Sequence, residues 1–487
     1  MRSPRHALLR LALAGGLAAG SVALVLPDGA STAVSEPPLR ATPQARCNDA
    51  SRPETSTQGR VPAVDYASGR AARGYTCNAT QVSHHGGAGG FKTFRYVDRA
   101  GHVCGYYDSG SIFSADLVTR KEGTGVVVLD MADPRRPRQT ANLTTPAMET
   151  PHESLFLNQR RGLLAAVAGN IETLPGQLDL YDVRADCRHP RLLSTLPLGG
   201  LGHESGFAPD GRTFYTSSTF GQVVTAVDVS DPALPHPIAT LGGVNFHGMR
   251  LSADGRTLYA ANLGNPSGPD STYSNGGLAV LDVSSIQDRD PLPAFKPVTG
   301  LAWSSGSIPQ SADPVTIKGH RYLLEVDEFA NYGARPNLVT GLGYQPDAPV
   351  GAARLIDVDD RRHPHVVSNL RLAVHQPKAR LGAQGKDPGA SSLVGGYAAH
   401  YCSAPRTVDP GLVACSMILS GLRVFDVRDP AHPREVAYFN KPAPGGAGAF
   451  SAPAWDLRHR MVWYSDTTSG FYAVRLARSV VPRHYWQ

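Results

Sequence analysis

Four histidines occupy equivalent positions in a set of sequence repeats, and histidine is the commonest metal-binding side chain in proteins. His203 and His247 each stand seven residues before an Asp-Gly turn, and His152 stands seven before Gln159 in the preceding repeat. His400 begins the corresponding strand of a later repeat. A neutral imidazole is a good ligand for copper, iron or zinc. The four residues therefore predict a transition-metal site, provided that the fold brings them together.

Two of these histidines stand in identical tripeptides, His152-Glu153-Ser154 and His203-Glu204-Ser205. Carboxylates often orient a metal-bound imidazole through its second nitrogen, so Glu153 and Glu204 are predicted to support the metal ligands from outside. Strand alternation nevertheless points each carboxylate away from its own histidine. A second interpretation stays open, in which one ancestral histidine was copied with the repeat and each ring bonds a neighbouring backbone group.

A repeated phrase determines where the histidines stand. Each copy is an apolar run that ends in Asp-Val or a close variant, and most copies continue into Asp-Pro-x-x-Pro. The alternation of Val, Ile, Leu, Tyr and Thr in these runs predicts β-strands. A repeat of this kind must stack on its neighbours to bury its apolar face. The seven copies begin at Gly125, Leu178, Val223, Gly277, Ala353, Gly421 and Gly470, the last with Arg475 in place of the aspartate.

Further strands surround each phrase. GHESGFAPDGRTFYTSST from Gly202 and FHGMRLSADGRTLYAANL from Phe246 each place an Asp-Gly turn between two strands. A last short strand such as REVAYF from Arg434 completes four antiparallel strands in a repeat of roughly 45 residues or more. The predicted fold is all-β, a seven-bladed β-propeller of four-stranded antiparallel blades. The last copy should close the ring against an N-terminal strand, and each phrase aspartate should cap the turn after its strand.

The aliphatic run followed by Asp-Val and Asp-Pro-x-x-Pro resembles the LVIVD repeat family of secreted bacterial β-propellers. The resemblance extends over about residues 85 to 478. It implies the blade fold and no particular chemistry, because a fold does not determine a function. A fainter resemblance is to selenium-binding propellers of the methanethiol-oxidase type, which also place metal-binding histidines in the channel. No motif of that second family matches this chain residue by residue.

The N-terminal part of the chain has two predicted segments. Residues 1–33 combine a basic start, an apolar run and a small-x-small site at Ser31, Thr32 and Ala33, the pattern of a secretory signal peptide. The apolar run is broken by glycines and shorter than a membrane span, so a secreted, extracytoplasmic protein is expected and not an integral membrane protein. Residues 34–83 are expected to be mobile and ordered only near the first blade. The propeller would then occupy residues 84–487.

The charge of the chain excludes one class of partner. The formal net charge is +6, and it comes mainly from arginines scattered along the chain, many of them in turns. Nucleic-acid binding requires clustered basic residues, so no nucleic-acid partner is predicted. A solvated basic surface that favours an anionic cell envelope explains the charge.

Six cysteines in an exported chain predict disulfides. Cys402 and Cys415 flank a turn around Pro410, which places them on adjacent antiparallel strands, so we predict that they pair. The other four allow three pairings, which stay open: Cys47, Cys77, Cys104 and Cys187.

The long insertions of this chain fall on one face of the predicted ring. In a blade, the loops between the second and third strands and between successive blades emerge on the same face. All four long insertions belong to these two classes, and loops of such length are usually functional. The histidines at the starts of the innermost strands would lie at the channel mouth on that face. The insertions begin at Tyr106, Asn262, Phe329 and Leu372.

An acidic cluster follows a strand that the sequence predicts to be buried. Glu325, Asp327 and Glu328 stand in the segment RYLLEVDEF, which heads toward the face with the long insertions. Alternation places Glu325 and Asp327 on one side of the strand. A salt bridge to arginine is the first interpretation of the cluster, and a calcium or carboxylate site is the second.

Two functions agree with these observations. The first is a non-catalytic envelope protein that binds a protein or small-molecule ligand through the long loops. The second is a metal-dependent, oxidase-like enzyme that holds its metal with the four histidines. The chain contains no nucleophile elbow, P-loop, His-Glu-x-x-His or dinucleotide motif, so no catalytic residue is assigned. Radial closure leaves no long exposed strand edge, so a monomer is expected.

Overall fold

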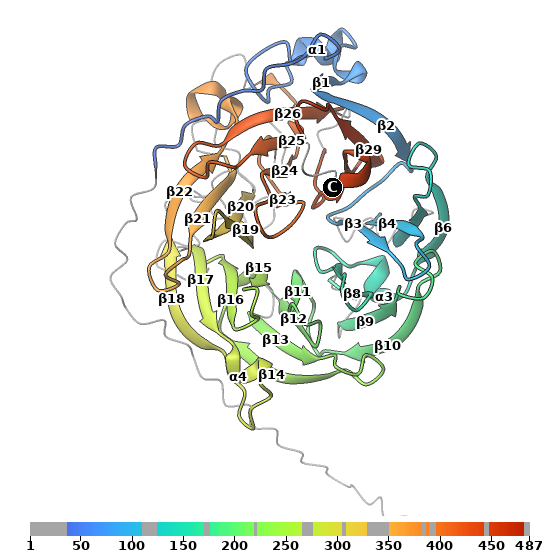
Figure 1. The fold of residues 1–487 in the computed structure, drawn as a ribbon, viewed down its shortest axis with the longest axis vertical. Helices are drawn as coiled ribbons and strands as arrows, with labels where there is room; N and C mark the ends of the chain where they lie inside the picture. The colour runs from blue at the N-terminus through green and yellow to red at the C-terminus, as the bar shows by residue number, and fades with distance from the viewer. Residues whose placement is uncertain are drawn as a thin grey trace, which may run out of the picture.

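Seven antiparallel β-sheets surround a central axis in the computed structural model (Figure 1). Each sheet is one blade of a seven-bladed β-propeller, as predicted, with its first strand near the axis and its fourth strand at the periphery. Among the described residues, no helix has the length and apolar character needed to cross a membrane. The structure describes residues 37–109, 124–169, 176–218, 222–264, 276–303, 308–328, 350–380, 386–388, 396–442 and 448–481. The predicted signal peptide, residues 1–33, lies outside them.

The first four blades each contain four strands in chain order. Blade one consists of β3 (Thr93–Val97), β4 (Val103–Asp108), β5 (Val126–Asp130) and β6 (Arg138–Leu143). Blade two consists of β7 (Phe156–Asn158), β8 (Leu163–Val167), β9 (Gln177–Asp182) and β10 (Arg191–Pro197). Blade three consists of β11 (Ser205–Phe207), β12 (Thr213–Ser218), β13 (Val223–Asp228) and β14 (His236–Gly242). Blade four consists of β15 (Phe246–Leu251), β16 (Thr257–Asn262), β17 (Gly277–Asp282) and β18 (Lys296–Ala302).

The last two blades each include a strand from the N-terminal part of the chain. Blade five consists of β19 (Ile308–Ile317), β20 (His320–Glu328), β21 (Ala353–Asp357) and β22 (His365–Leu370). Blade six consists of β23 (Tyr401–Ser403), β24 (Leu412–Met417), β25 (Gly421–Asp426) and β26 (Arg434–Asn440), with β1 (Tyr75–Cys77) as a fifth strand. Blade seven consists of β27 (Ala454–Asp456), β28 (Met461–Asp466), β29 (Gly470–Leu476) and β2 (Ala79–His85).

Helical segments are short wherever the structure describes them. The α-helices are α1 (Ala63–Ala67), α3 (Pro146–Glu149) and α4 (Ser284–Gln287). The 3₁₀ turns are η1 (Ala71–Arg73), η3 (Ala373–His375), η4 (Pro377–Arg380) and η6 (Leu457–His459).

The repeated phrase forms the third strand of every blade, and its aspartate has the predicted capping role. Asp130 accepts a hydrogen bond from the backbone N–H two residues later, at 2.9 Å, and Asp426 does the same at 3.1 Å. This bond holds the tight turn to the fourth strand. The same contact is made by Asp182, Asp228, Asp282 and Asp357.

The hydrophobic core lies between neighbouring blades. The first five residues of β17 are buried, as expected for a strand covered on both faces. One core cluster joins Tyr215 and Val224 of blade three to Leu258 and Leu281 of blade four. Face-to-face packing of adjacent sheets around the ring therefore fixes where each innermost strand begins, and with it the positions of the histidines.

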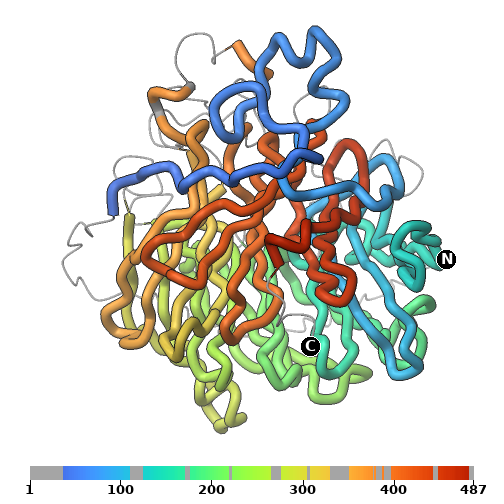
Figure 2. Tube along the Cα trace, turned by 45° about the horizontal axis from the view of Figure 1, so that its top comes forward, coloured from blue at the N-terminus to red at the C-terminus, as the bar shows by residue number. Residues whose placement is uncertain are grey.

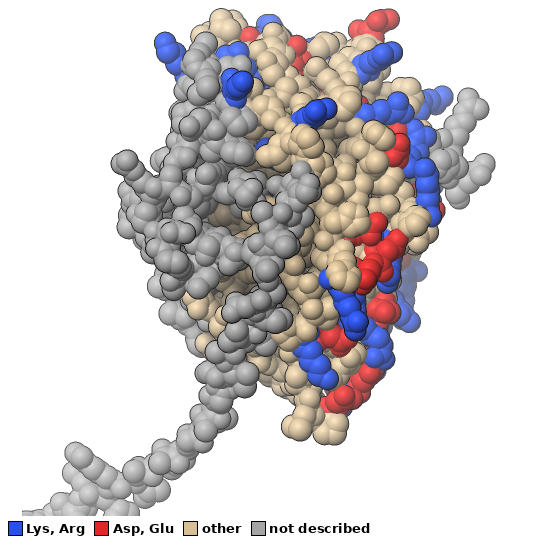
Figure 3. Space-filling model, turned by 90° about the vertical axis from the view of Figure 1, so that its left-hand side faces the viewer, with Lys and Arg blue, Asp and Glu red and all other residues tan. Residues whose placement is uncertain are grey.

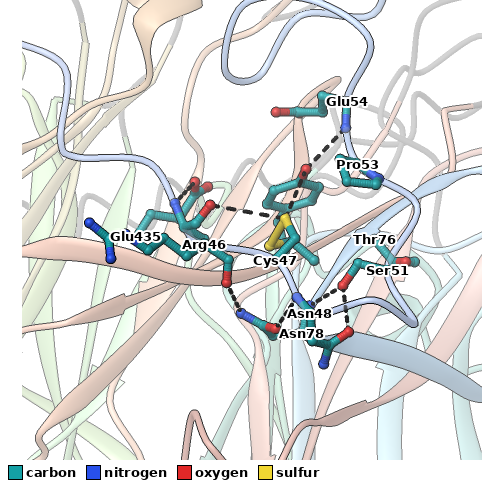
Figure 4. Close-up of a disulfide and its surroundings, with 12 residues drawn as sticks. Arg46, Cys47, Asn48, Ser51, Pro53, Glu54, Thr76, Asn78 and Glu435 are labelled. Atoms are coloured by element: carbon teal, nitrogen blue, oxygen red, sulfur yellow. Dashed lines mark hydrogen bonds between the residues drawn. A yellow bond between two sulfur atoms is a disulfide. The ribbon is translucent and has the colours of Figure 1, made fainter.

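The N-terminal segment differs from the expectation that residues 34–83 are mobile. From residue 37 the chain first bonds Asn369 of β22 in blade five, then lies along blade six and becomes the fifth strand β1, which pairs with β26 (Figure 2). The disulfide between Cys47 and Cys77 ties the segment to itself, with Asn78 bonding the backbone of Arg46 beside it (Figure 4). The buried carboxylate of Glu54 also pairs with Arg423 of β25. These partners are distant in sequence, so local composition does not reveal them.

The ring is closed as predicted by an N-terminal strand. β2 is antiparallel to β29, the copy of the phrase without aspartate, from Ala79 opposite Leu476 to His85 opposite Phe471. The propeller therefore includes residues before 84, and its last blade contains both ends of the ring.

Three disulfides are present. The predicted pair, Cys402 and Cys415, joins directly opposite residues of β23 and β24. Cys104 of β4 is bonded to Cys187, which follows β9 in the next blade, and Cys47 is bonded to Cys77.

Charged residues on the side surface alternate in sign (Figure 3). On the part of the face that is not grey, lysines and arginines lie beside aspartates and glutamates. Arg256 and Asp288 form one such surface pair, 2.8 Å apart. The described residues visible on this face therefore form no continuous basic patch.

Candidate functional site

The structure brings the four predicted histidines together where the innermost strands of different blades begin. His203 Nε2 lies 2.7 Å from His247 Nε2, and the rings of His152 and His203 are 4.4 Å apart between centroids. His400 joins them through a shared partner, because Glu153 contacts both His247 and His400. Side chains from blades two, three, four and six thus meet at one end of the channel.

Glu153 occupies the centre of this cluster. Its Oε2 lies 3.0 Å from His247 Nε2 and 3.6 Å from His203 Nε2. Its Oε1 lies 3.0 Å from His400 Nε2. Glu153 therefore lies among the imidazoles, whereas the sequence predicted it to act from outside the ligand set.

The backbone at His152 explains this difference. His152 has a φ of 47°, in the left-handed region that residues other than glycine rarely adopt. It precedes β7, so the regular alternation on which the prediction relied does not apply. The turn directs both His152 and Glu153 into the cluster. Backbone strain of this kind concentrates at functional sites.

Glu204 lies outside the histidine cluster. Its carboxylate is 2.5 Å from Lys92 Nζ and 3.0 Å from Arg250 Nη1, deeper in the channel. The second His-Glu-Ser tripeptide keeps regular alternation, with His203 in the cluster and Glu204 turned away. The predicted role of Glu204 beside the metal ligands therefore does not match its position.

Glu328 is also a member of the cluster. The sequence placed it in an acidic segment and did not assign it to the histidines. Its Oε2 lies 3.1 Å from His400 Nε2, and its Oε1 lies 3.8 Å from His247 Nδ1. The other two acids of its strand, Glu325 and Asp327, face the opposite side and bind Arg354 at 2.6 and 2.8 Å. The salt bridge predicted for the acidic segment is thus present. The alternation of side chains along β20 was the sequence signal that Glu328 points to the opposite side from Glu325 and Asp327.

Hydrogen bonds orient two of the imidazole rings. The Nδ1 atom of His247 is 2.9 Å from the carbonyl oxygen of Pro309, and that of His400 is 2.6 Å from the carbonyl oxygen of Phe450. Each Nδ1 must carry a proton to donate to a carbonyl, so each Nε2 faces the carboxylates. Metal-bound histidines are commonly oriented in this way.

The cluster separates its histidines into two electrostatic classes. Burial lowers the pKa of His152 and lowers that of His203 further, and the neighbouring imidazoles add to the shift for His203. Burial also opposes the charged form of His400, but its bonds to Glu153 and Glu328 outweigh this and raise its pKa to about 9. The pKa of His247 is raised in the same sense. His152 and His203 are therefore neutral at pH 7, whereas His400 shares positive charge with the carboxylates.

The two carboxylates of the cluster also have pKa values that are shifted in opposite directions. Burial would raise the pKa of Glu153, but His247 and His400 hold it well below its usual range. Burial raises the pKa of Glu328 despite its bond to His400. Glu153 is therefore the permanent negative charge at the centre of the cluster.

A polar layer closes the inner side of the cluster. The Gln310 Nε2 donates to Glu153 Oε2 and to the Tyr401 hydroxyl, both at 2.6 Å. The ring of Phe91 packs against His152 and His400, with centroid distances of 4.9 and 5.3 Å. Among the ligand candidates, His152 and His203 are the most exposed, so access is from their side.

The donor atoms are close enough to share a cation. Two sets of three residues each offer ligand atoms within 4.8 Å of one another, His152 with Glu153 and His203, and Glu153 with Glu328 and His400. Nitrogen and carboxylate oxygen donors without sulfur suit zinc, iron, copper or manganese. The arrangement can hold such an ion.

Most of the long-loop face lies outside the described residues. Three of the four insertions fall largely in residues 110–123, 265–275 and 329–349, and the fourth includes 381–385 and 389–395. The chain order of the strands does confirm that these segments join second to third strands or successive blades.

Comparison with known proteins identifies no family. No family model matches the chain, and no curated protein matches it either, so the resemblance to LVIVD repeats stays a prediction. Among solved structures, the periplasmic gluconolactonase of Pseudomonas aeruginosa is 16% identical with a TM-score of 0.48, and 76% of this chain and 92% of that chain are covered. Identity at this level carries no inference about activity.

Other similar structures have different functions. The β-propeller domain of Cps50 (Swd1) from Myceliophteria thermophila is 12% identical with a TM-score of 0.47, covering 81% of this chain and 98% of that one. Kuenenia stuttgartiensis hydrazine synthase is 12% identical with a TM-score of 0.48, covering 81% and 97%.

Proposed function

We propose that this propeller is an exported metal-dependent enzyme with one transition-metal ion at the mouth of its channel. The Nε2 atoms of His203, His247 and His400 and the carboxylate of Glu153 would hold the ion, with Glu328 beside His400. The proposal rests on their contacts of 2.7 to 3.6 Å.

One observation carries the proposal. His247 and His400 direct their Nδ1 protons to backbone carbonyls and their Nε2 atoms to carboxylates about 3 Å away. A neutral imidazole oriented like this would place a lone pair against a negative oxygen. A cation must therefore lie between them, either a proton on each ring or a metal ion shared by both. A metal ion would also bind the Nε2 of His203, which already lies against the Nε2 of His247.

The ring of His152 suits a role in proton transfer. It is neutral at pH 7 because burial lowers its pKa, and it stands beside His203 on the accessible side of the cluster. A neutral imidazole next to a metal-bound water or substrate can accept its proton. The metal would supply Lewis acidity or electron transfer. The substrate would be a small molecule that enters from the face with the long insertions.

The three disulfides support an extracytoplasmic location, because disulfides persist in oxidising compartments. An exported enzyme can acquire copper, iron or zinc there, and the donor set accepts each of them. The oxidase-like interpretation requires copper or iron, whereas zinc would indicate hydrolytic or lyase chemistry.

Elemental analysis of protein purified without a histidine tag tests the proposal. We expect about one equivalent of a transition metal per chain, and loss of this metal in the His247→Ala/His400→Ala double variant. Electron paramagnetic resonance of the same sample distinguishes copper or iron from zinc. His236→Ala is the matched control, because His236 is an exposed residue of β14 on the periphery.

Two results would contradict the proposal. The first is a purified chain without metal that also fails to bind Cu²⁺, Fe²⁺ or Zn²⁺ in calorimetric titrations. The second is metal that remains after both ring substitutions. In either case the cluster would be a protonated His-carboxylate network.

A further inference from the structure

A cavity of about 410 Å³ lies in the other half of the channel. Its wall comes from the innermost strands β3, β7, β15, β19, β23 and β27. Tyr401 of the wall directly follows His400, and Arg250 stands three residues after His247 along β15. Since a strand advances about 3.3 Å per residue, the cavity begins beneath the histidine cluster and extends toward the opposite face.

The two sites are separated by the layer already described. Tyr401 accepts from Gln310 on the side of the histidines and lines the cavity on the other. Lys92 Nζ lies 3.7 Å from the centre of the Tyr401 ring. A ligand in the cavity would therefore contact different residues from those that would hold the metal.

Basic side chains dominate the charged part of the wall. Lys92, Arg95 and Arg250 line the cavity with a single carboxylate, Asp313. Two of the three cations already have close partners, since Lys92 binds Glu204 at 2.5 Å and Arg250 Nε binds Asp313 at 2.8 Å. Arg250 also contacts Glu204. These charges are balanced within the wall.

Arg95 has the loosest of these ion pairs. Its Nε lies 3.5 Å from Oδ1 of the buried Asp456, too far for a normal hydrogen bond, and this Oδ1 has no hydrogen-bond partner either. The other oxygen of Asp456 is bonded to His459 at 2.7 Å. The Arg95 Nε atom is buried without a hydrogen-bond partner, although the side chain is 24% exposed. Because this ion pair is long and Arg95 lines the cavity, its guanidinium can also donate to an anion held there.

Aromatic rings form the apolar part of the same wall. Phe94, Phe156 and Trp455 line the cavity with Arg95, and the rings of Phe94 and Phe156 meet edge to face at 5.7 Å. The Trp455 indole N–H is directed to Ser403, which leaves the ring as an apolar surface. Pockets of this size with apolar walls and a few polar groups are typical of small-molecule sites.

We propose that this cavity binds a small organic anion with one carboxylate and a flat apolar body. The carboxylate would accept hydrogen bonds from the Arg95 guanidinium. The apolar body would lie against Phe94, Phe156 and Trp455. The site is distinct from the histidine cluster, so its occupancy does not depend on the metal proposal.

Calorimetric titration of the full chain with benzoate tests this site. The protein is first treated with a chelator, so that benzoate has no metal to bind. We expect saturable binding of one benzoate, and affinity at least about tenfold lower for neutral benzamide, because a charged hydrogen bond is lost. Arg95→Gln should weaken benzoate binding by a similar factor. Arg99→Gln, an exposed arginine two residues beyond the end of β3, should leave it unchanged.

A second variant protects the test from folding effects. Gln159→Glu places a negative charge on an exposed residue of the cavity wall, and it should also weaken benzoate binding. Absence of benzoate binding, equal binding of benzamide, or an unchanged affinity in a folded Arg95→Gln protein would each overturn the proposal.

Discussion

At the scale of single residues, the two His-Glu-Ser tripeptides show how one backbone angle changes the role of a side chain. The φ of 47° at His152 directs Glu153 into the histidine cluster. Glu204, in the regular copy, instead neutralises Lys92 and Arg250. The two tripeptides also show that a carboxylate at the same repeat position can contact either the histidine cluster or the basic residues of the channel wall.

Glu153→Gln should destabilise the metal-free protein by about 3 kcal/mol or more at pH 7, because removing one partner leaves buried imidazolium charge uncompensated. His400, with its pKa raised to about 9, is protonated at this pH and would keep only Glu328. Urea unfolding of chelator-treated protein measures the change. Glu149→Gln, a half-buried residue of α3, is the control. Equal stability of the two variants would show that the cluster carries no buried charge.

The substitution Asp108→Asn tests whether the buried carboxyl group of Asp108, close to the histidine cluster, has a raised pKa. Burial raises the pKa of Asp108 to about 6, against hydrogen bonds from the N–H groups of Lys92 and Phe91. Because the folded pKa lies above the unfolded value, the contribution of Asp108 to stability is present at pH 4 and lost as pH rises through 6. Relative to Asp108→Asn, the wild type should therefore lose about 2 kcal/mol between pH 4 and 7. If urea unfolding gave the same difference in unfolding free energy between the wild type and Asp108→Asn at pH 4 and at pH 7, the raised pKa of Asp108 would be refuted.

The sequence located the four histidines and named Glu153 as a supporting residue, but it placed Glu153 outside the ligand set and did not assign Glu328 to the histidines. Repeat alignment succeeded for His152, His203, His247 and His400 because each stands at a fixed distance from a strand. The position of Glu153 in the cluster depends on the left-handed backbone angle at His152. No pattern in the sequence predicts that angle. Glu328 comes from β20, a second strand, whereas the histidines lie at the starts of first strands, so the repeat gave no reason to include it.

At the scale of elements, strands with a local signal were predictable and strands with only distant partners were not. All seven copies of the phrase form third strands, because alternation and the aspartate cap are local. β1 was missed because its partner, β26, is more than 350 residues away. Closure of the ring by an N-terminal strand was predicted, but the bounds of β2 were not, because its partner β29 is also more than 350 residues away. Their stability comes from sheet edges that exist only after the ring has formed.

The cross-strand disulfide gives a prediction at this scale. Cys402 and Cys415 lie directly opposite each other and close a loop with a sequence separation of 13. On the chain-entropy model, the Cys402→Ala/Cys415→Ala variant should lose about 3 kcal/mol of unfolding free energy. Mass spectrometry of unreduced peptides checks the bond, and chemical unfolding measures its effect. A free thiol at either position would rule out the pairing.

At the scale of the whole molecule, the two ends of the chain hold the ring together. β2 supplies the outer strand of blade seven, and the segment before it reaches blade six through Glu54 and Arg423. Arg423 is fully buried between Glu54 and Glu435. The N-terminal segment is therefore part of the folded unit, and its loss should affect stability rather than only solubility.

A series of shortened chains separates these contributions. A chain beginning at Pro37 should be as stable as the full chain, because every described contact remains. A chain beginning at Ala79 keeps β2 but leaves Arg423 with one carboxylate, and should lose about 3–5 kcal/mol. A chain beginning at Gly86 also lacks β2 and exposes the edge of β29, which should open the ring and cause aggregation. Unfolding curves and light scattering measure the series, and equal behaviour of the last two chains would show that β2 does not close the propeller.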